Sequence, residues 1–160
     1  MTACKIQLEK VSLDFDGCTV ISDLSLRTTE KRIAVIGRNG SGKSTLARLI
    51  CGLIAPSEGC VKVDGIDVLN DRKMAVQTVG LLFQNPDHQI IFPTVLEEIS
   101  FGLRQIGQPS ETANHQAKSI LNQFGCLDWS DRAIVSLSQG QRHLVCLLSI
   151  LAMSPRLLVL

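Results

Sequence analysis

The residues whose types and spacing could do chemistry are concentrated in one short segment, which reads GRNGSGKST at positions 37–45. It matches the pattern G-x-x-x-x-G-K-[ST] at Gly37, Gly42, Lys43 and Ser44. Glycines let successive backbone N–H groups turn inward around anionic oxygens. The lysine would neutralise the β- and γ-phosphates, and the next hydroxyl is placed to ligate Mg²⁺. The segment therefore predicts a site for a nucleoside triphosphate with Mg²⁺.

The whole segment supplies candidate ligand-binding residues, because backbone amides and side chains both line a loop of this kind. An apolar run precedes it at residues 32–36, and we expect a strand there that is buried on both faces. Apolar residues then recur at helical spacing over residues 43–53, so a helix dipole would point its positive end at the phosphates. The alternative is an ordinary glycine-rich turn. The candidates are Gly37, Arg38, Asn39, Gly40, Ser41, Gly42, Lys43, Ser44 and Thr45.

The loop alone leaves kinases, GTPases, motor ATPases and transport ATPases open. A GTPase would need a base-reading N-K-x-D segment, and the sequence contains none. A small-molecule kinase would need an arginine-rich lid, whereas the region after Gln84 is acidic and apolar. A second motif, SLSQGQR at residues 136–142, narrows the choice. Its serine hydroxyl and glycine amides would form a second anion site at a helix start, or they would only cap that helix.

The second motif lies about 95 residues after the first and resembles the L-S-G-G-Q signature of the ATP-binding subunits of ABC transporters. Leu137, Ser138, Gly140 and Gln141 match the signature, whereas Gln139 replaces its first glycine. The resemblance implies that Ser138, Gly140 and Gln141 bind the γ-phosphate of an ATP molecule held by a second ATP-binding subunit. One loop and one signature in each chain would then give a homodimer or heterodimer with two shared sites.

The resemblance covers residues 5–160 and implies the fold class, an α/β P-loop NTPase. The expected fold has a RecA-like core, an N-terminal antiparallel β-subdomain and an inserted helical subdomain, and it is C-terminally incomplete. We expect the β-subdomain and P-loop core at residues 1–84. A Q-loop and helical signature subdomain would follow at 85–154, and the start of the Walker B strand at 155–160.

The resemblance assigns three further positions. Gln84 matches the Q-loop glutamine, which contacts Mg²⁺ or the attacking water and senses the membrane partner. Phe15 matches the aromatic residue that stacks on adenine, although a half-buried strand phenylalanine would give the same pattern. The final RLLVL, at residues 156–160, matches the Walker B strand. In the family an aspartate for Mg²⁺ and a glutamate that activates water follow this strand, and the sequence contains neither there.

Without these acids, the 160 residues alone are expected to bind ATP but to hydrolyse it negligibly, because general-base assistance contributes about 10²–10⁴ in rate. Ser44 and Gln84 would be the remaining Mg²⁺ contacts. An uncovered apolar strand at the end of the chain would also favour aggregation. The D-loop and switch histidine of the family are missing as well.

A third segment, QNPDHQIIFPTVLEEISFG, places the resemblance within one branch of the family. It is similar to energy-coupling-factor ATPases and their cobalt-transport relatives, which serve importers of vitamins and metal ions. In that branch the segment docks a transmembrane subunit, so we expect Ile90, Ile91 and Phe92 to be exposed; the alternative is burial in the helical subdomain. The motif LSQGQRHLVCLL is most similar to subunits of biotin importers. The matching residues are Asn85, Pro86, Asp87, Gln89, Pro93, Thr94, Val95, Glu97, Glu98 and Phe101.

Hydrophobic periodicity predicts the elements that must position these motifs. Alternating or continuous apolar runs indicate strands, and spacing of three to four residues indicates helices. Strands alternating with helices favour a largely parallel sheet. We expect strands at residues 5–15, 24–28, 59–65, 78–84 and 157–160, and helices over 93–124, broken near 107–109, and over 137–153.

Composition excludes several classes of protein. The net charge is +1 and no run of three basic residues occurs, so a nucleic-acid partner is not expected. Six cysteines show neither C-x-x-C nor metal-ligand spacing, which favours reduced thiols that pack as small apolar side chains. The most apolar stretch, LVCLLSILAM, is half the roughly 20 residues of a membrane span, and the N-terminal residues do not resemble a signal peptide.

The predicted function is ATP hydrolysis that powers import of a vitamin such as biotin or a metal ion such as cobalt. The implied cofactors are ATP and Mg²⁺, and the implied place is the cytoplasmic face of the cell membrane. The partners would be a second ATP-binding subunit, a transmembrane coupling subunit contacted through residues 84–92 and, indirectly, a substrate-binding membrane subunit. Two alternatives remain: a nucleotide-binding but inert fragment or remnant, and a soluble ABC ATPase not tied to a transporter.

Overall fold

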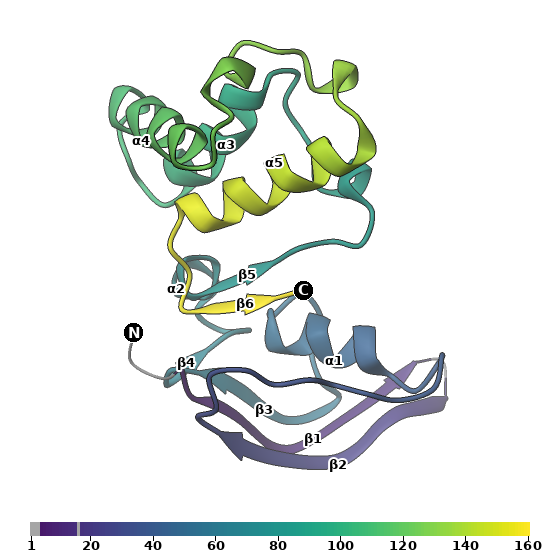
Figure 1. Ribbon diagram of the computed structural model, residues 1–160. Helices are drawn as coiled ribbons and strands as arrows, with labels where there is room; N and C mark the ends of the chain where they lie inside the picture. Colours follow the sequence, from purple (N-terminus) through teal and green to yellow (C-terminus); the bar gives the residue numbers. More distant parts are fainter. Residues whose placement is uncertain (1–3, 16) are drawn as a thin grey trace. The chain divides into compact units, whose positions relative to one another are not determined.

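The computed structural model describes residues 4–15 and 17–160 of the chain. The chain divides into two compact units, one ending at Val79 and one beginning at Gly80. A four-stranded sheet and the glycine-rich loop belong to the first unit, and the three longest helices belong to the second (Figure 1). Each unit has its own buried side chains, so each is described by itself.

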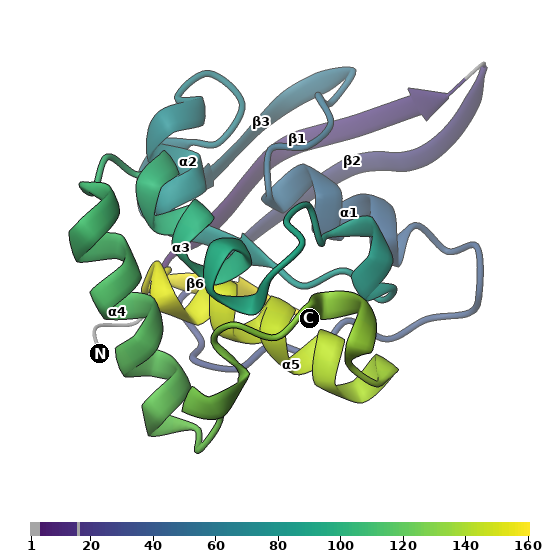
Figure 2. The ribbon, with the colours of Figure 1, turned by 90° about the horizontal axis from the view of Figure 1, so that it is seen from above.

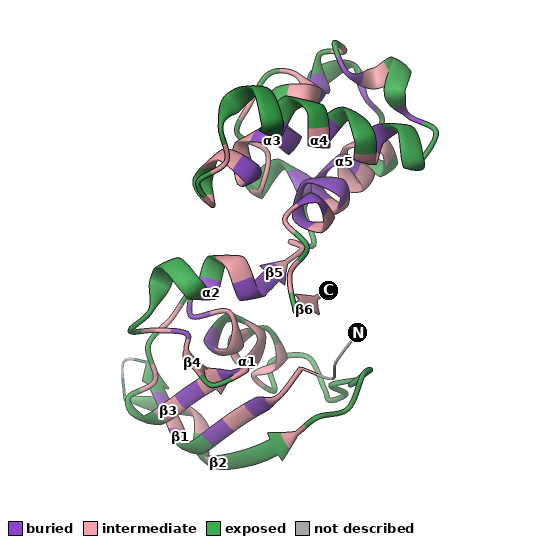
Figure 3. Ribbon diagram, turned by 90° about the vertical axis from the view of Figure 1, so that its left-hand side faces the viewer, coloured by how far each residue is buried: buried purple, intermediate pink, exposed green. Residues whose placement is uncertain are grey.

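The first unit is built on a four-stranded antiparallel sheet. Its strands are β1 (Ile6–Phe15), β2 (Cys18–Thr28), β3 (Glu58–Val63) and β4 (Ile66–Asp67), in the order β2-β1-β3-β4. One face of β1 and β3 is buried, as Figure 3 shows along both strands. This sheet agrees with the predicted N-terminal antiparallel β-subdomain, and the strands expected at residues 5–15 and 59–65 are confirmed. The buried side chains are Ile6, Leu8, Val11, Leu13, Val61 and Val63.

The long hairpin of β1 and β2 is bent by bulges (Figure 2). The buried positions of β1 skip from Leu8 to Val11, because the pairing with both neighbouring strands shifts there. Lys10 lies at the shift with a φ of +50°, and its N–H donates to the Ser25 hydroxyl at 3.1 Å. An extra residue in a strand reverses the faces of all later side chains. The bulge therefore returns Val11 to the buried face.

Two helices flank this sheet, α1 (Lys43–Ile50) and α2 (Arg72–Thr78). The helix expected over residues 43–53 is shorter than predicted, because the chain turns away at Gly52, which has a φ of +66°. A Cβ at Gly52 would lie 2.2 Å from the Val68 carbonyl oxygen, so only glycine allows this approach. Helix α2 was not predicted from the sequence. It has seven residues, and Asp71 caps it by accepting from the N–H of Met74.

The apolar run before the glycine-rich loop is not the buried strand that we expected. Residues 32–38 have no strand pairing, and the exposed fractions of Ile33, Val35 and Ile36 are 47%, 53% and 91%. A strand is defined by a hydrogen-bonded neighbour, and no described residue provides one for this segment. The expected largely parallel sheet is likewise absent from the described residues, where β5 (Val79–Leu81) and β6 (Leu157–Val159) pair only with each other.

The second unit is a helical bundle with one apolar core. It contains α3 (Val95–Gln105), α4 (Ser110–Gln123) and α5 (Gln139–Ala152), which confirms the predicted helices and the break near residues 107–109. Three short 3₁₀ turns accompany them: η1 (Pro86–His88) precedes α3, and η2 (Leu127–Trp129) and η3 (Ile134–Ser136) lie between α4 and α5. Among the described residues, no helix combines the length and apolar character that a membrane span requires. The core residues are Val95, Ile99, Leu103, Ala113, Ala117, Leu121, Cys126, Ile134, Leu137, Val145, Leu148 and Ala152.

The end of α5 contains a strained residue whose replacement should stabilise the chain. Ser154 follows the C-cap Met153 and has a φ of +54°, a left-handed conformation that costs a residue with a Cβ roughly 1–2 kcal/mol. Ser154→Gly should raise the free energy of unfolding by about 0.5–1 kcal/mol after the entropy of the unfolded glycine is subtracted. Denaturant unfolding measures the change. The control Ser119→Gly, on the exposed side of α4, should lower stability; a decrease in both variants would contradict the prediction.

Candidate functional site

The glycine-rich loop, residues 37–42, turns the chain directly into α1. Gly40 and Gly42 have φ angles of +81° and +84°, which side chains with a Cβ rarely adopt. The N–H of Ser41 donates to the Arg38 carbonyl oxygen at 3.2 Å and closes the turn. A Cβ at Gly42 would also lie 3.4 Å from the Val20 carbonyl oxygen, so the loop runs close to β2. The predicted loop-to-helix arrangement is therefore present, although an unpaired extended segment precedes it.

Positive charge and free donors meet at the start of α1. The Lys43 ammonium donates to the carbonyl oxygens of Gly37, at 2.8 Å, and Arg38, at 2.7 Å, which folds its side chain over the loop. Two of its three N–H donors are used in this way. The first-turn N–H groups of a helix have no acceptor within the helix. Gly42 provides no capping side chain, and the first turn of α1 contains no acidic residue. This helix start is therefore suited to bind an anion.

Phe15 lies at the end of the hairpin whose second strand borders the loop. It pairs with Cys18 at the turn, and its side chain is 49% exposed. Val20, two residues after Cys18, is the residue that the loop approaches at Gly42. The structure thus places an accessible aromatic ring on the same strand pair that borders the loop. Such a ring can stack on a planar base.

The second motif forms the start of α5. Ser138 is the N-cap, and its hydroxyl accepts from the Gln141 N–H at 3.3 Å, while the Gln141 side-chain oxygen accepts from the Ser138 N–H at 2.9 Å. This capping box is the purely structural alternative that the sequence left open. The Ser138 hydroxyl only accepts a hydrogen bond in this capping box, so it can still donate its own proton to another group.

No contact among the described residues explains why a glycine stands at position 140, in the first turn of α5. Gly140 is exposed, and a Cβ there would meet no heavy atom within 4 Å. Glycine inside a helix costs about 1 kcal/mol relative to alanine. The open space above Gly140 therefore allows a ligand or partner to approach the helix backbone.

Gln84 is exposed, and hydrogen bonds hold the backbone of the second unit both before and after it. Before it, the Leu82 N–H donates to the Val159 carbonyl oxygen at 2.9 Å, which ties it to the β6 chain. After it, the Asn85 side chain accepts from the Asp87 N–H at 3.0 Å and begins η1. We expected Gln84 to end its strand, but β5 ends three residues earlier, at Leu81. The side chain is nevertheless available to a ligand.

The apolar residues at 90–92 do not share one environment, which corrects the expectation that all three are exposed. Ile91 is 70% exposed, whereas Ile90 packs against the helical core. Phe92 is partly buried, and the centroid of its ring lies 4.8 Å from that of the Phe101 ring. Buried Glu98, whose role the sequence did not indicate, accepts from the N–H groups of Ile91 at 2.9 Å and Phe92 at 2.8 Å. It fixes the conformation that exposes Ile91 alone.

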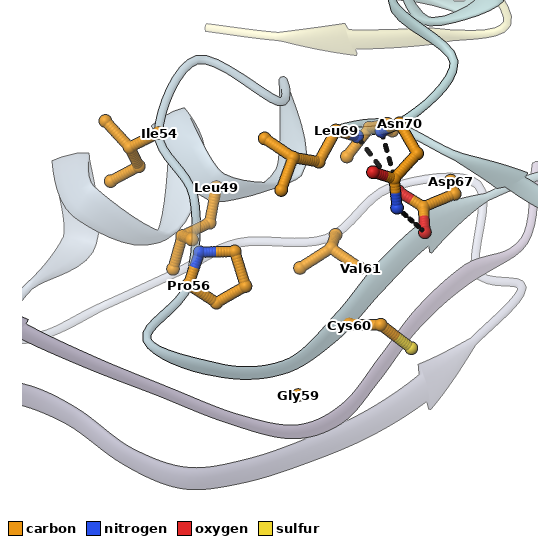
Figure 4. Close-up of a pocket in the computed structure, with 10 residues that line it drawn as sticks. Leu49, Ile54, Pro56, Gly59, Cys60, Val61, Asp67, Leu69 and Asn70 are labelled. Carbon is orange, nitrogen blue, oxygen red and sulfur yellow. Dashed lines mark hydrogen bonds between the residues drawn. The ribbon is translucent and has the colours of Figure 1, made fainter.

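A pocket in the first unit is too small to be a nucleotide site. Its volume is about 50 Å³, whereas ligand pockets usually have about 300–1,000 Å³. Figure 4 shows apolar side chains such as Leu49 and Val61 around it, with Asp67 at one side. Hydrogen bonds from the N–H and side-chain amide of Asn70 lower the pKa of Asp67 below its usual value. The carboxylate is thus already satisfied by its own turn.

The cysteines of the second unit behave as the sequence predicted. Cys126 and Cys146 are buried in or beside the helical core. Burial raises the pKa of Cys146 to about 12 and that of Cys51, in the first unit, to about 11. These thiols stay protonated at neutral pH and are poor nucleophiles or metal ligands. Among the described residues, no cluster of three or more His, Cys, Asp or Glu side chains could hold a metal ion.

Comparisons with known proteins agree with these features. The ABC transporter family model matches residues 21–160. The chain is 57% identical to the biotin transport ATP-binding protein BioM of Rhodobacter capsulatus, over 94% of this chain and 64% of that protein. It is 37% identical to the energy-coupling factor transporter ATP-binding protein EcfA1 of Fusobacterium nucleatum, over 96% of this chain and 60% of that protein.

A solved structure has a similar fold. The cbiO1 protein of Clostridium perfringens, part of the ABC transporter complex cbiONQ, superposes with a TM-score of 0.80 and 26% identity over 98% of this chain and 64% of that one. The chain thus spans about two thirds of the length of the proteins that it matches. Because the family model covers most of the sequence, including the glycine-rich loop and the start of α5, the chain belongs to the ABC transporter ATP-binding family.

Proposed function

We propose that the protein is the ATP-binding and ATP-hydrolysing subunit of an energy-coupling-factor-type ABC importer. The observation that carries this proposal is the uncapped start of α1, with the Lys43 ammonium folded over the glycine-rich loop. The similarity to a biotin transport protein favours a vitamin such as biotin as the imported cargo. A metal ion such as cobalt is the other candidate cargo. The relatives that the chain matches are longer than this chain, and we assign the hydrolysis to a full-length protein of that kind.

The triphosphate would be held by residues 37–45. Backbone N–H groups of the loop and of the first turn of α1 would donate to phosphate oxygens, and Lys43 would exchange its carbonyl partners for the β- and γ-phosphates. Ser44 and Gln84 would contact Mg²⁺, which neutralises phosphate charge when bound. Phe15, with its accessible ring, would stack on adenine.

The start of α5 would serve the nucleotide of a second ATP-binding subunit. Three features support this role: the Ser138 proton remains available, Gly140 leaves its backbone open, and Gln141 beside them is partly exposed. An anion at a helix start is favoured by the helix dipole and by the free N–H groups there. The protein would therefore act as a homodimer or heterodimer, with each start of α5 completing the partner's site.

Residues 84–92 would contact the transmembrane coupling subunit, and through it the substrate-binding membrane subunit. Ile91 is the apolar side chain that this segment presents to solvent, while Gln84 lies exposed at its beginning. An exposed isoleucine on a braced loop can insert into an apolar groove of a partner. The protein would then be peripheral, on the cytoplasmic face of the membrane. In this assignment residues 1–84 form the β-subdomain and P-loop core, 85–154 the helical signature subdomain and 155–160 the Walker B start.

Replacing Lys43 tests nucleotide binding. Lys43→Ala removes the ammonium from the glycine-rich loop, and charge-assisted hydrogen bonds contribute roughly 1.5–3 kcal/mol. We expect Mg²⁺-ATP affinity to fall by about ten- to a hundredfold, measured by calorimetry on the folded full chain. Lys118→Ala, on the exposed side of α4, is the matched control and should bind like the unchanged chain. Equal affinities for both variants would refute the assignment.

Replacing Ser138 separates helix capping from anion binding. Ser138→Ala removes the cap of α5 and should lower the free energy of unfolding by about 1 kcal/mol. Ser138→Asp keeps a capping oxygen, so stability should be retained. Its negative charge should repel the partner's nucleotide, and ATP-dependent dimerisation should be lost in sedimentation experiments with Mg²⁺-ATP. An aspartate variant that dimerises normally would limit Ser138 to capping.

Replacing Ile91 tests membrane docking. Ile91→Ser should lower co-purification with the transmembrane subunit after co-expression, because it removes the exposed apolar side chain of residues 84–92. Mg²⁺-ATP affinity and thermal stability should not change, since the side chain lies outside the core. Leu127→Ser, at another exposed apolar position of the same unit, is the control. Normal co-purification of the Ile91 variant would exclude this docking surface.

A further inference from the structure

The side chain of Gln89 joins two segments of the second unit that are far apart in sequence. Its Oε1 accepts from the Phe83 N–H at 3.2 Å, and its Nε2 donates to the Cys146 carbonyl oxygen at 3.1 Å. Phe83 immediately precedes Gln84, and Cys146 lies in the middle of α5. The segment that follows β5 accordingly passes beside α5 (Figure 1). One amide thus holds the backbone next to Gln84 against the helix whose first turn contains Ser138.

Further contacts join the same two segments. Pro86 is buried, and the Cys146 thiol lies 3.9 Å from its carbonyl oxygen. Asp87 forms an ion pair with Arg142 of α5 at 3.7 Å. The pair is partly exposed, and surface ion pairs contribute little. Gln89 therefore provides the better-defined link, because its one amide makes two hydrogen bonds to backbone groups, to the Phe83 N–H and to the Cys146 carbonyl oxygen, which also accepts from the Ser149 hydroxyl at 2.8 Å.

We propose that Gln89 is a positioning residue, which fixes the Phe83–Gln84 backbone on α5 so that Gln84 and the first turn of α5 move together. The proposal rests on the proposed function in one respect, the Mg²⁺ contact of Gln84. Both halves of the amide are required, because Phe83 offers a donor and Cys146 an acceptor. Glutamate keeps only the acceptor, and leucine keeps neither.

Amide hydrogen exchange of the full chain tests the tether directly. In Gln89→Leu, the Phe83 amide should exchange about tenfold faster, the loss expected for one hydrogen bond of roughly 1.4 kcal/mol. Gln89→Glu, which retains the acceptor for Phe83 but lacks the donor to Cys146, should restore only part of the protection. Gln105→Leu removes an exposed glutamine of α3 and should change nothing at Phe83. Unchanged Phe83 exchange in a natively folded Gln89→Leu chain would overturn the proposal.

The Mg²⁺ requirement of ATP binding tests the effect on Gln84. Gln84→Ala and Gln89→Leu should each raise the Mg²⁺ concentration at half-maximal ATP binding, and the double variant should match Gln84→Ala within about twofold. Additive effects would show that Gln89 does not act through Gln84, and would overturn that part of the proposal. If Gln84→Ala has no effect, the Mg²⁺ contact in the proposed function is wrong. The amide exchange of Phe83 alone then tests whether Gln89 holds the Phe83 backbone on α5.

Discussion

The start of α1 has an electrostatic imbalance on which the proposed chemistry depends. The other four α-helices of the described residues begin with a capping side chain or an acidic first turn: Asp71 for α2, Thr94 for α3, Glu111 for α4 and Ser138 for α5. Helix α1 has neither. Its dipole and free N–H groups are therefore left for an external anion. The rest of the first unit supports this helix, since Leu49 is buried on one side and Gly52 approaches Val68 at its end.

In the second unit, polar side chains form hydrogen bonds with backbone groups of residues that are separated from them in sequence. Glu98 on α3 binds the chain at residues 91–92, and Gln89 joins Phe83 to α5. Buried polar groups are favourable only when they are hydrogen-bonded, so both side chains restrict the segment between β5 and α3 to one conformation. The exposed side chains of that segment, Gln84 and Ile91, are thus displayed on a fixed backbone.

Elements with a strong local period could be predicted from the sequence, and elements defined by distant neighbours could not. The strand β1 and the helices α3, α4 and α5 were predicted because their buried residues repeat along the chain. Helix α2 was missed because seven residues give too short a pattern. Residues 32–36 were predicted as a buried strand from their apolar composition, but composition does not supply a pairing partner.

In the candidate site, too, the features set by contiguous residues could be predicted from the sequence, and those set by residues distant in sequence could not. The loop and the capping box are contiguous motifs, whereas the placement of Phe92 depends on its ring contact with Phe101 and on the hydrogen bond from its N–H to Glu98. Ile91 is exposed, whereas its two apolar neighbours are partly buried. No pattern in the sequence separates the three, because their environments are set by helices that begin later in the chain.

The space around each glycine distinguishes glycines that the fold requires from glycines that leave the backbone open to other molecules. A Cβ at Gly52, Gly59 or Gly80 would lie within 2.3 Å of another atom of the chain, so packing explains these positions. Gly140 differs, because it is helical, exposed and free of nearby atoms. Helical glycine lowers stability by about 1 kcal/mol relative to alanine, and no contact within the described residues offsets that loss. Close approach of an external group to the start of α5 would account for the residue, and the proposed second subunit with its nucleotide requires such an approach.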